Sequence, residues 1–460
     1  MSYTRVEKVE INSINAPANN TYGFHQGFPI VQFEIAAQNK MLVGTSVRLN
    51  GEFSILQNVV GSATIGTLVN NNSARFGGIG AAAPAVFSAC ANNRVGVAST
   101  IQQITLSNQE NNQSLEICRQ YPRYLATVMP VTHSGLDFDS NVQQQSGTAS
   151  RNSVSAAGMN EVTSFSMPLR TGLLSGTAPL PLSQLGGLNI EILLSPDANA
   201  IGPNISVAGV ETSTGATYYR LQNLTLSYDL LVPDEDLEAQ MTNVSDGAIS
   251  YNSINHIYST INSSDQSLVL NLGSQKVLSV FSNFIPTPHI NDFTKDSNGT
   301  PFLANKGAAG LYDATADVTE IAFSKGGVNF PIDTPIVATT GGGGFRPEVE
   351  YLSNLMDSIK PFRHTNHTLV QLQTQCGLAI GAGEIGYDSY VNPATLPDHR
   401  PVAGLGIRTD PFKVGIDYSR QPYGLRIRST LDGESPNSIF TYTLSENTLT
   451  YSPNGIRVLN

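Results

Sequence analysis

The amino-acid sequence predicts an all-β protein built from two tandem units of similar size. Only 13% of its 460 residues are charged, about half the usual fraction, whereas 41 glycines and 25 prolines supply frequent turns. Short apolar runs with a period of two recur along the chain, without a regular alternation of strands and helices. Several short stretches also return in the same order about half a chain length later. These observations favour many antiparallel strands in a duplicated domain.

The clearest internal repeat joins the middle of the chain to a stretch near its end. Gln184 and the run Gly187-Leu188-x-Ile190 match Gln421 and Gly424-Leu425-x-Ile427 at one constant offset. Three more matches follow in the same order along the chain: residues 40–42 with 276–278, the surroundings of Glu116 with those of Glu350, and residues 225–228 with 448–451. Collinear matches of this kind are what a duplication leaves behind.

The most regular strand signal closes the first half. Apolar residues occupy every second position from 224 to 232, and the alternate positions from 223 to 229 are polar. This is the period of a strand with one buried face. Further strands are predicted at residues 47–55, 101–106, 165–174 and 188–194 of the first half, and at 268–272, 277–281, 369–372 and 440–456 of the second.

Each half also carries one predicted short helix at an equivalent place. In the first half, Ser114 is a candidate N-cap and Glu116 suits the positive end of the helix dipole. Apolar residues then follow at helical spacing: Cys118, Tyr121, Leu125 and Val128. Pro122 conflicts with a continuous helix and predicts a kink or a break. In the second half, Pro347 suits a first helical position before apolar residues spaced helically over 349–359.

The boundary between the units is predicted near the acidic cluster that follows Pro233. The units are then residues 1–235, with a polar N-terminal arm over about 1–27, and residues 236–460. Two strand-rich units of this size match antiparallel sandwiches, and the eight-stranded jelly roll is the natural candidate. The predicted fold is therefore two tandem eight-stranded jelly rolls, each with a short helix between strands.

Charge and cysteine content narrow the possible partners. The formal net charge is −11, and no basic cluster is present to bind a polyphosphate, so no sequence-specific nucleic-acid partner is expected. Three distant cysteines, Cys90, Cys118 and Cys376, are predicted to be buried free thiols. The sequence suggests neither a secretion signal nor a transmembrane segment.

Several patterns invite a metal or phosphate site, but each lacks a necessary part. His364 and His367, with His399, have no helical His-Glu-x-x-His frame for zinc. The glycine run at 341–344 lacks the lysine of a phosphate loop. Two acidic groups lack the glycine-centred calcium loop: Asp137 with Asp139, and Asp234 with Asp236 and Glu238. The serine-nucleophile elbow is also absent. No catalytic residue, metal ligand or cofactor site is predicted.

Three blocks of the first half resemble a known family. They are residues 167–169 with 180–182 and 187–192, the strand 219–228, and the segment 115–121. Together with the duplication, they resemble the double jelly-roll major capsid proteins, the lineage of adenovirus hexon and tectivirus coat proteins. In size and texture the chain is most similar to those of polinton-like viruses and virophages.

This resemblance implies a structural capsid protein of a DNA virus rather than an enzyme. It implies homotrimers that form pseudo-hexagonal capsomers and tile an icosahedral shell in the virion, assembled inside the host cell. The expected partners are other copies of the chain, penton proteins and minor capsid proteins. The sparse charge fits extensive subunit contacts, because interface cores are depleted in charged residues.

Two other functions remain open from the sequence. A β-sandwich adhesin or receptor-binding lectin would bind sugar through exposed aromatic side chains and would not tile. A two-domain carbohydrate-active enzyme would use a pair of carboxylates, whose pairing in space is not visible in sequence spacing. Self-association separates the capsid hypothesis from both alternatives.

Overall fold

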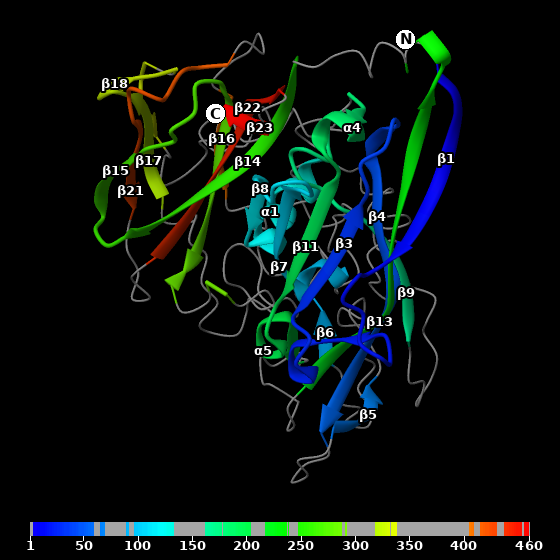
Figure 1. Ribbon diagram of the computed structural model, residues 1–460. Helices are drawn as coiled ribbons and strands as arrows, with labels where there is room; N and C mark the ends of the chain where they lie inside the picture. The colour runs from blue at the N-terminus through cyan, green and yellow to red at the C-terminus, as the bar shows by residue number, and fades with distance from the viewer. Residues whose placement is uncertain are drawn as a thin grey trace, which may run out of the picture.

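The structure is a computed structural model in which β-strands dominate both halves of the chain (Figure 1). The described residues are 3–58, 65–69, 89–91, 96–132, 162–176, 178–203, 217–236, 238, 247–287, 290–291, 318–331, 333–337, 404–408, 415–429, 437–452 and 455–459.

The first half of the chain ends with a long strand, β13. The strands of the first half are β1 (Tyr3–Asn12), β2 (Thr21–Tyr22), β3 (Ile30–Ile35), β4 (Met41–Asn58), β5 (Ile65–Val69), β6 (Ala89–Ala91), β7 (Ile101–Asn108), β8 (Ser114–Arg119), β9 (Thr163–Pro168), β10 (Leu180–Pro181), β11 (Leu188–Leu194), β12 (Ile201–Pro203) and β13 (Thr217–Pro233). Its helical segments are η1 (Phe24–Gln26), η2 (Gly96–Thr100), α1 (Tyr121–Thr132), α4 (Leu182–Leu185) and α5 (Asp197–Ala200).

The second half begins with another long strand, β14. Its strands are β14 (Gly247–Ile261), β15 (Asp265–Leu270), β16 (Val277–Pro286), β17 (Val318–Lys325), β18 (Val328–Asn329), β19 (Ile336–Val337), β20 (Gly404–Arg408), β21 (Tyr423–Ser429), β22 (Asn437–Ser452) and β23 (Gly455–Leu459).

The two halves repeat one sheet arrangement. In the first half, one sheet has the order β1-β13-β4-β10 and another has β3-β11-β7-β8. In the second half, the corresponding orders are β14-β22-β16-β20 and β15-β21-β17-β18. The strand pairs are antiparallel, and within the described ranges no sheet combines strands from both halves. Each half is therefore built on two main antiparallel sheets, and the first half also contains the two-stranded sheet β12-β6.

Three of the four sequence repeats fall at equivalent places in these sheets. Gly187 directly precedes β11 and Gly424 lies in β21, and each strand is second in its sheet. The repeats at 40–42 and 276–278 mark the starts of β4 and β16. The repeats at 225–228 and 448–451 lie in β13 and β22. The sequence evidence for a duplication is thus confirmed, while the fourth repeat, at Glu350, lies outside the described residues.

The core follows the predicted alternation. In β11, Leu188, Ile190, Ile192 and Leu194 are buried and the residues between them are partly exposed. In β13, the even-numbered residues from 224 to 230 are buried in the same way. The period-two pattern therefore identified the inward-facing side chains of these strands correctly.

The predicted start of the first helix is wrong. Ser114 and Glu116 lie in strand β8, which pairs with β7, and α1 begins only at Tyr121. Gln120 separates the two elements with a left-handed φ of 52°. Pro122 then lies in the first turn of α1, where a missing N–H leaves no helical bond unmade, so it starts the helix without a kink. Tyr121, Leu125 and Val128 are buried on one side, as their spacing predicted.

The N-terminal segment is also more ordered than an arm. Residues 3–12 form β1 at the edge of a sheet, where Val6 lies opposite Leu231 and Val9 opposite Tyr228 of β13. The polar stretch that contains Pro17 does not form a strand, in agreement with the sequence. The expected polar arm therefore contributes a strand to the first half.

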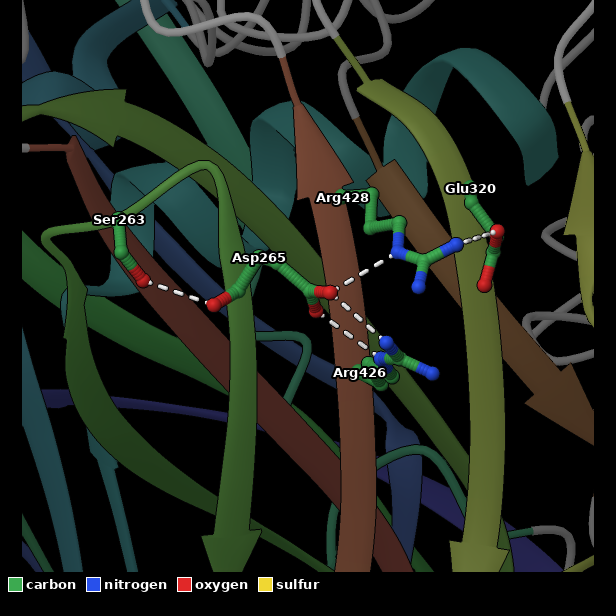
Figure 2. A network of polar contacts seen from close by, with 5 residues as sticks. All are labelled: Ser263, Asp265, Glu320, Arg426 and Arg428. Atoms are coloured by element: carbon green, nitrogen blue, oxygen red, sulfur yellow. Dashed lines mark hydrogen bonds and ion pairs between the residues drawn. The ribbon is translucent and has the colours of Figure 1, made fainter.

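The outer face of the second half carries an ion-pair network across three adjacent strands (Figure 2). Arg426 donates to both carboxylate oxygens of Asp265, at 2.9 and 2.7 Å. Arg428 donates to Asp265 at 2.9 Å and to Glu320 at 2.6 Å. These bonds, first that from Arg426, hold the pKa of Asp265 well below its usual range. Because most of the network is exposed, it contributes little to stability.

Replacing a core residue of β11 should cost far more than replacing an outward one. Ile190→Ala should lower the free energy of unfolding by about 2–5 kcal/mol, because it leaves a cavity between the sheets. Leu193→Ala, on the half-buried opposite face of the same strand, is the matched control. Denaturant unfolding of both variants measures the difference, and equal losses would contradict the assigned facing of β11.

Candidate functional site: the junction of the two halves

The two halves meet through strand β8 and helix α1 of the first half. In Figure 1 these elements lie between the sheets of the first half and strands β14 and β16 of the second. One continuous apolar cluster includes Tyr121 and Tyr124 of α1 together with Phe281, Tyr442 and Leu444 of the second half. A separate cluster lies between the two sheets of the second half. The junction is thus packed like a domain interior.

A buried carboxylate lies at the centre of this junction. Glu116 of β8 accepts hydrogen bonds from the backbone N–H groups of Gly172 and Leu173, in the first half, each at 2.8 Å. It also accepts one from the N–H of Ile254 in β14, at 2.8 Å. Ile254 belongs to the edge strand of its sheet, so the carboxylate occupies a position that a neighbouring strand would otherwise fill.

Burial and hydrogen bonding act in opposite directions on Glu116. Burial raises the pKa of its carboxyl group, and the three backbone N–H donors partly offset that rise. Charged acceptors make stronger hydrogen bonds than neutral ones, which favours this arrangement of donors around a carboxylate.

Close backbone contact surrounds the carboxylate. A Cβ atom on Gly172 would lie 2.6 Å from the carbonyl oxygen of Asn252 and 2.8 Å from the Cα of Ser253. Only glycine allows the backbones of the two halves to approach this closely. The Tyr251 hydroxyl group donates to the carbonyl oxygen of Leu115 at 2.9 Å, beside Glu116. Hydrogen bonds and backbone packing therefore fix β8 against β14.

An aromatic cluster extends the junction along β22. The ring centroids of Tyr124 lie 5.9 Å from Tyr442 and 6.4 Å from Phe281, and those two rings stack at 5.4 Å. His256 of β14 stacks on Phe440 at 6.3 Å. Burial, and then the nearby Arg119 charge, lower the pKa of His256 to about 4.

The residues that the sequence singled out as candidate ligands do not form this site. His364, His367, His399, Asp137, Asp139 and the glycine run at 341–344 lie outside the described residues, as does the predicted helix at 347–359. Asp234, Asp236 and Glu238 lie within the residues that the structure describes. Over the described ranges, no three side chains of metal-binding type converge. Cys118 is a buried free thiol, and burial raises its pKa well above the usual value.

The sequence predicts Glu116 at a helix N-terminus, where its charge would suit the dipole, and this is wrong because Glu116 lies in strand β8. Its real signal is its context, a lone acid among Leu115, Ile117 and Cys118 in an apolar strand. A buried charge needs partners, and here they are backbone groups far away in sequence. No comparable feature of the sequence marks Gly172 as the place where the backbones of the two halves approach each other.

No protein-family model and no curated protein matches the sequence. Solved structures do match over nearly the whole chain. The PBCV-1 protein VP54, fitted into a reconstruction of the virophage Sputnik, has a TM-score of 0.56 at 11% identity over 100% of this chain and 98% of its own. The major capsid protein of Faustovirus has a TM-score of 0.54 at 9% identity, over 97% and 90%.

A chain in the Sputnik virophage structure also matches, with a TM-score of 0.54 at 10% identity over 100% of this chain and 89% of its own. At such low identity these matches establish the fold. The chain has the all-β, double jelly-roll fold of these capsid proteins, as the sequence predicted. None of the helices in the described part of the chain has the length and hydropathy needed to span a bilayer.

Removing the charge of Glu116 should weaken the junction. In Glu116→Gln, one carbonyl oxygen and an NH₂ group face three backbone N–H donors, so at least one donor loses its acceptor, at a cost of about 1–3 kcal/mol. Hydrogen exchange at the Leu173 amide should also quicken, because its acceptor Oε2 is the atom that the NH₂ group replaces when the remaining oxygen keeps the other two donors. Glu191→Gln, which changes a half-buried acid of β11 in the same way, is the control. Equal stability and exchange in both variants would contradict the role of Glu116.

Acid should weaken the junction through His256. Because its folded-state pKa of about 4 lies below the ordinary value of 6.5, the unfolded chain binds the proton more readily. The contribution to stability is complete above pH 6.5 and declines as the pH falls towards 4, by at most about 3 kcal/mol. His256→Phe keeps a ring against Phe440 but cannot titrate. The free energy of unfolding of the unmodified protein and of the variant is measured between pH 7 and 4. The decline that comes from His256 should be absent in the variant.

Proposed function

We propose that the chain is a major capsid protein, a structural protein of a virus shell without enzymatic activity. The observation that carries this proposal is the match of the whole chain, both halves included, to capsid proteins of PBCV-1 and Faustovirus. A match to one jelly roll alone would fit many functions, whereas a complete pair in the same arrangement fits few.

The junction supports this function physically. A capsomer must keep its shape when it contacts its neighbours in the shell, so its two jelly rolls need a fixed relative orientation. The aromatic cluster and the bonds of Glu116 to both halves provide such a fixed joint. Residues 1–235 and 236–460 are the proposed jelly rolls, a boundary supported by the absence of shared sheets in the described chain.

The proposed assembly is a homotrimer that serves as a pseudo-hexagonal capsomer of an icosahedral shell. Six jelly rolls from three subunits would form the outline of each tile. Penton and minor capsid proteins are the proposed further partners. The virion of a DNA virus is the proposed location, with assembly inside the host cell.

Mass in solution tests the proposal. Light scattering across a concentration series should give a constant mass of about three times the subunit mass of 49.1 kDa. Electron microscopy of the same sample should then show tiles with six-fold outline. A monomer at every concentration would contradict the capsomer and favour the lectin alternative, which glycan binding would decide.

A further inference from the structure

Strand β1 lies at the edge of its sheet and is held by little side-chain packing (Figure 1). Six of its ten side chains are exposed and none is buried. Val9 and Ile11 pack, partly buried, against the main core, and Tyr3 packs against Met41. In the described part of the chain, β13 is the strand with which β1 pairs. The backbone ladder to β13 therefore supplies much of what holds β1.

The equivalent strand of the second half, β14, is held more firmly. Ile11 of β1 pairs with Leu226 as Ile249 of β14 pairs with Leu449, and these two leucines belong to one of the sequence repeats. Four side chains of β14 are buried, and at Ile254 its N–H donates to the first half. The duplication has thus produced two edge strands, of which β14 is packed into the molecule and β1 is not.

The chain that follows β1 is held independently of it. The Ser13 hydroxyl group is hydrogen-bonded to the hydroxyl group of Tyr22. The Asn15 side chain accepts from the N–H of Gln32 at 3.0 Å and donates to the carbonyl oxygen of Ile30 at 2.8 Å. These bonds join the chain to β2 and β3 and not to β1. A separation of β1 from β13 can therefore stop where β1 ends.

An ion pair joins β1 to the segment that leads into β4. The Lys40 Nζ lies 2.6 Å from one carboxylate oxygen of Glu7, and Arg5 lies 2.5 Å from the other. The hydrogen bond from Lys40 is the largest influence that holds the pKa of Glu7 below its ordinary value. The lysine at the repeated position in the second half, Lys276, binds Glu446 of the interior strand β22 at 3.0 Å. The repeated lysine thus contacts an interior strand in one half and the edge strand in the other.

We propose that β1 is a detachable strand, which opens from β13 as a unit while the rest of the first half stays folded, and that the Lys40–Glu7 pair is its latch. Exposed ion pairs contribute little to stability and are weakened by salt, so this latch opens readily and salt eases its opening. Opening uncovers the backbone edge of β13, where an extended strand can be added. This device goes beyond the proposed function and does not depend on it.

Hydrogen exchange of the full chain, resolved by overlapping fragments, tests the opening. After correction for intrinsic rates, the amides of β1 should exchange at least about a hundredfold faster than those of β4, which pairs with the other edge of β13. The Ile14 amide, which donates to the carbonyl oxygen of Gln32 at 2.9 Å, should stay protected with β3.

A charge-removing variant tests the latch. Glu7→Gln should speed the exchange of the β1 amides about two- to fivefold. Sodium chloride at about 1 M should do the same to the unmodified protein and have little effect on the variant. Glu446→Gln is the matched control, because it removes the equivalent lysine pair from β22 and should leave β1 unchanged.

Each part of the proposal has a result that overturns it. Exchange of β1 as slow as that of β4 would show that the strand does not detach. Fast exchange that continues through Ile14 would show that β1 does not open as a separate unit. An equal effect of Glu7→Gln and Glu446→Gln on β1, or no effect of Glu7→Gln, would exclude the latch. The mass in solution tests the proposed function separately, so the two failures are distinguishable.

Discussion

The bond between Glu116 and the N–H of Ile254 is the constraint on which the arrangement of the two halves depends. Separating the halves would leave a carboxylate without one of its donors and an edge N–H without its acceptor. Breaking such a buried interaction on one side is costly, because the remaining group keeps its desolvation penalty. The close approach at Gly172 and the tyrosine cluster act in the same place. The two rolls are thereby held as one body.

This joint requires the second half to bury both faces of one sheet. On one face of β22, Ile439 belongs to the second half's own core, and the Thr441 hydroxyl pairs with that of Ser282 at 2.8 Å. On the other face, Phe440 and Tyr442 pack against the first half. A strand buried on both faces has no place for charge, and residues 437–445 contain none.

The sequence was sufficient for the features that depend on local pattern. The alternation over 224–230 fixed which side chains of β13 face inward, and the repeats located equivalent strands in both halves. The sequence did not predict where the first helix begins. A candidate N-cap at Ser114 followed by spaced apolar residues is also compatible with a strand, a turn at Gln120 and a helix that begins later. The junction could not be predicted, since residues 116, 172 and 254 are brought together only by the complete fold.

The equivalent edge strands β1 and β14 show how the junction affected the duplicated sequence. Each is first in its sheet and pairs with the long closing strand of its half. The edge of β1 is exposed, and this strand carries Arg5, Glu7, Lys8 and Glu10, the charges that protect an open edge from pairing with other chains. β14 carries no Asp, Glu, Lys or Arg, and at Ile254 its edge N–H donates to Glu116 of the first half. At the edge of its sheet β1 thus carries its own charges, whereas β14 binds a carboxylate of the first half.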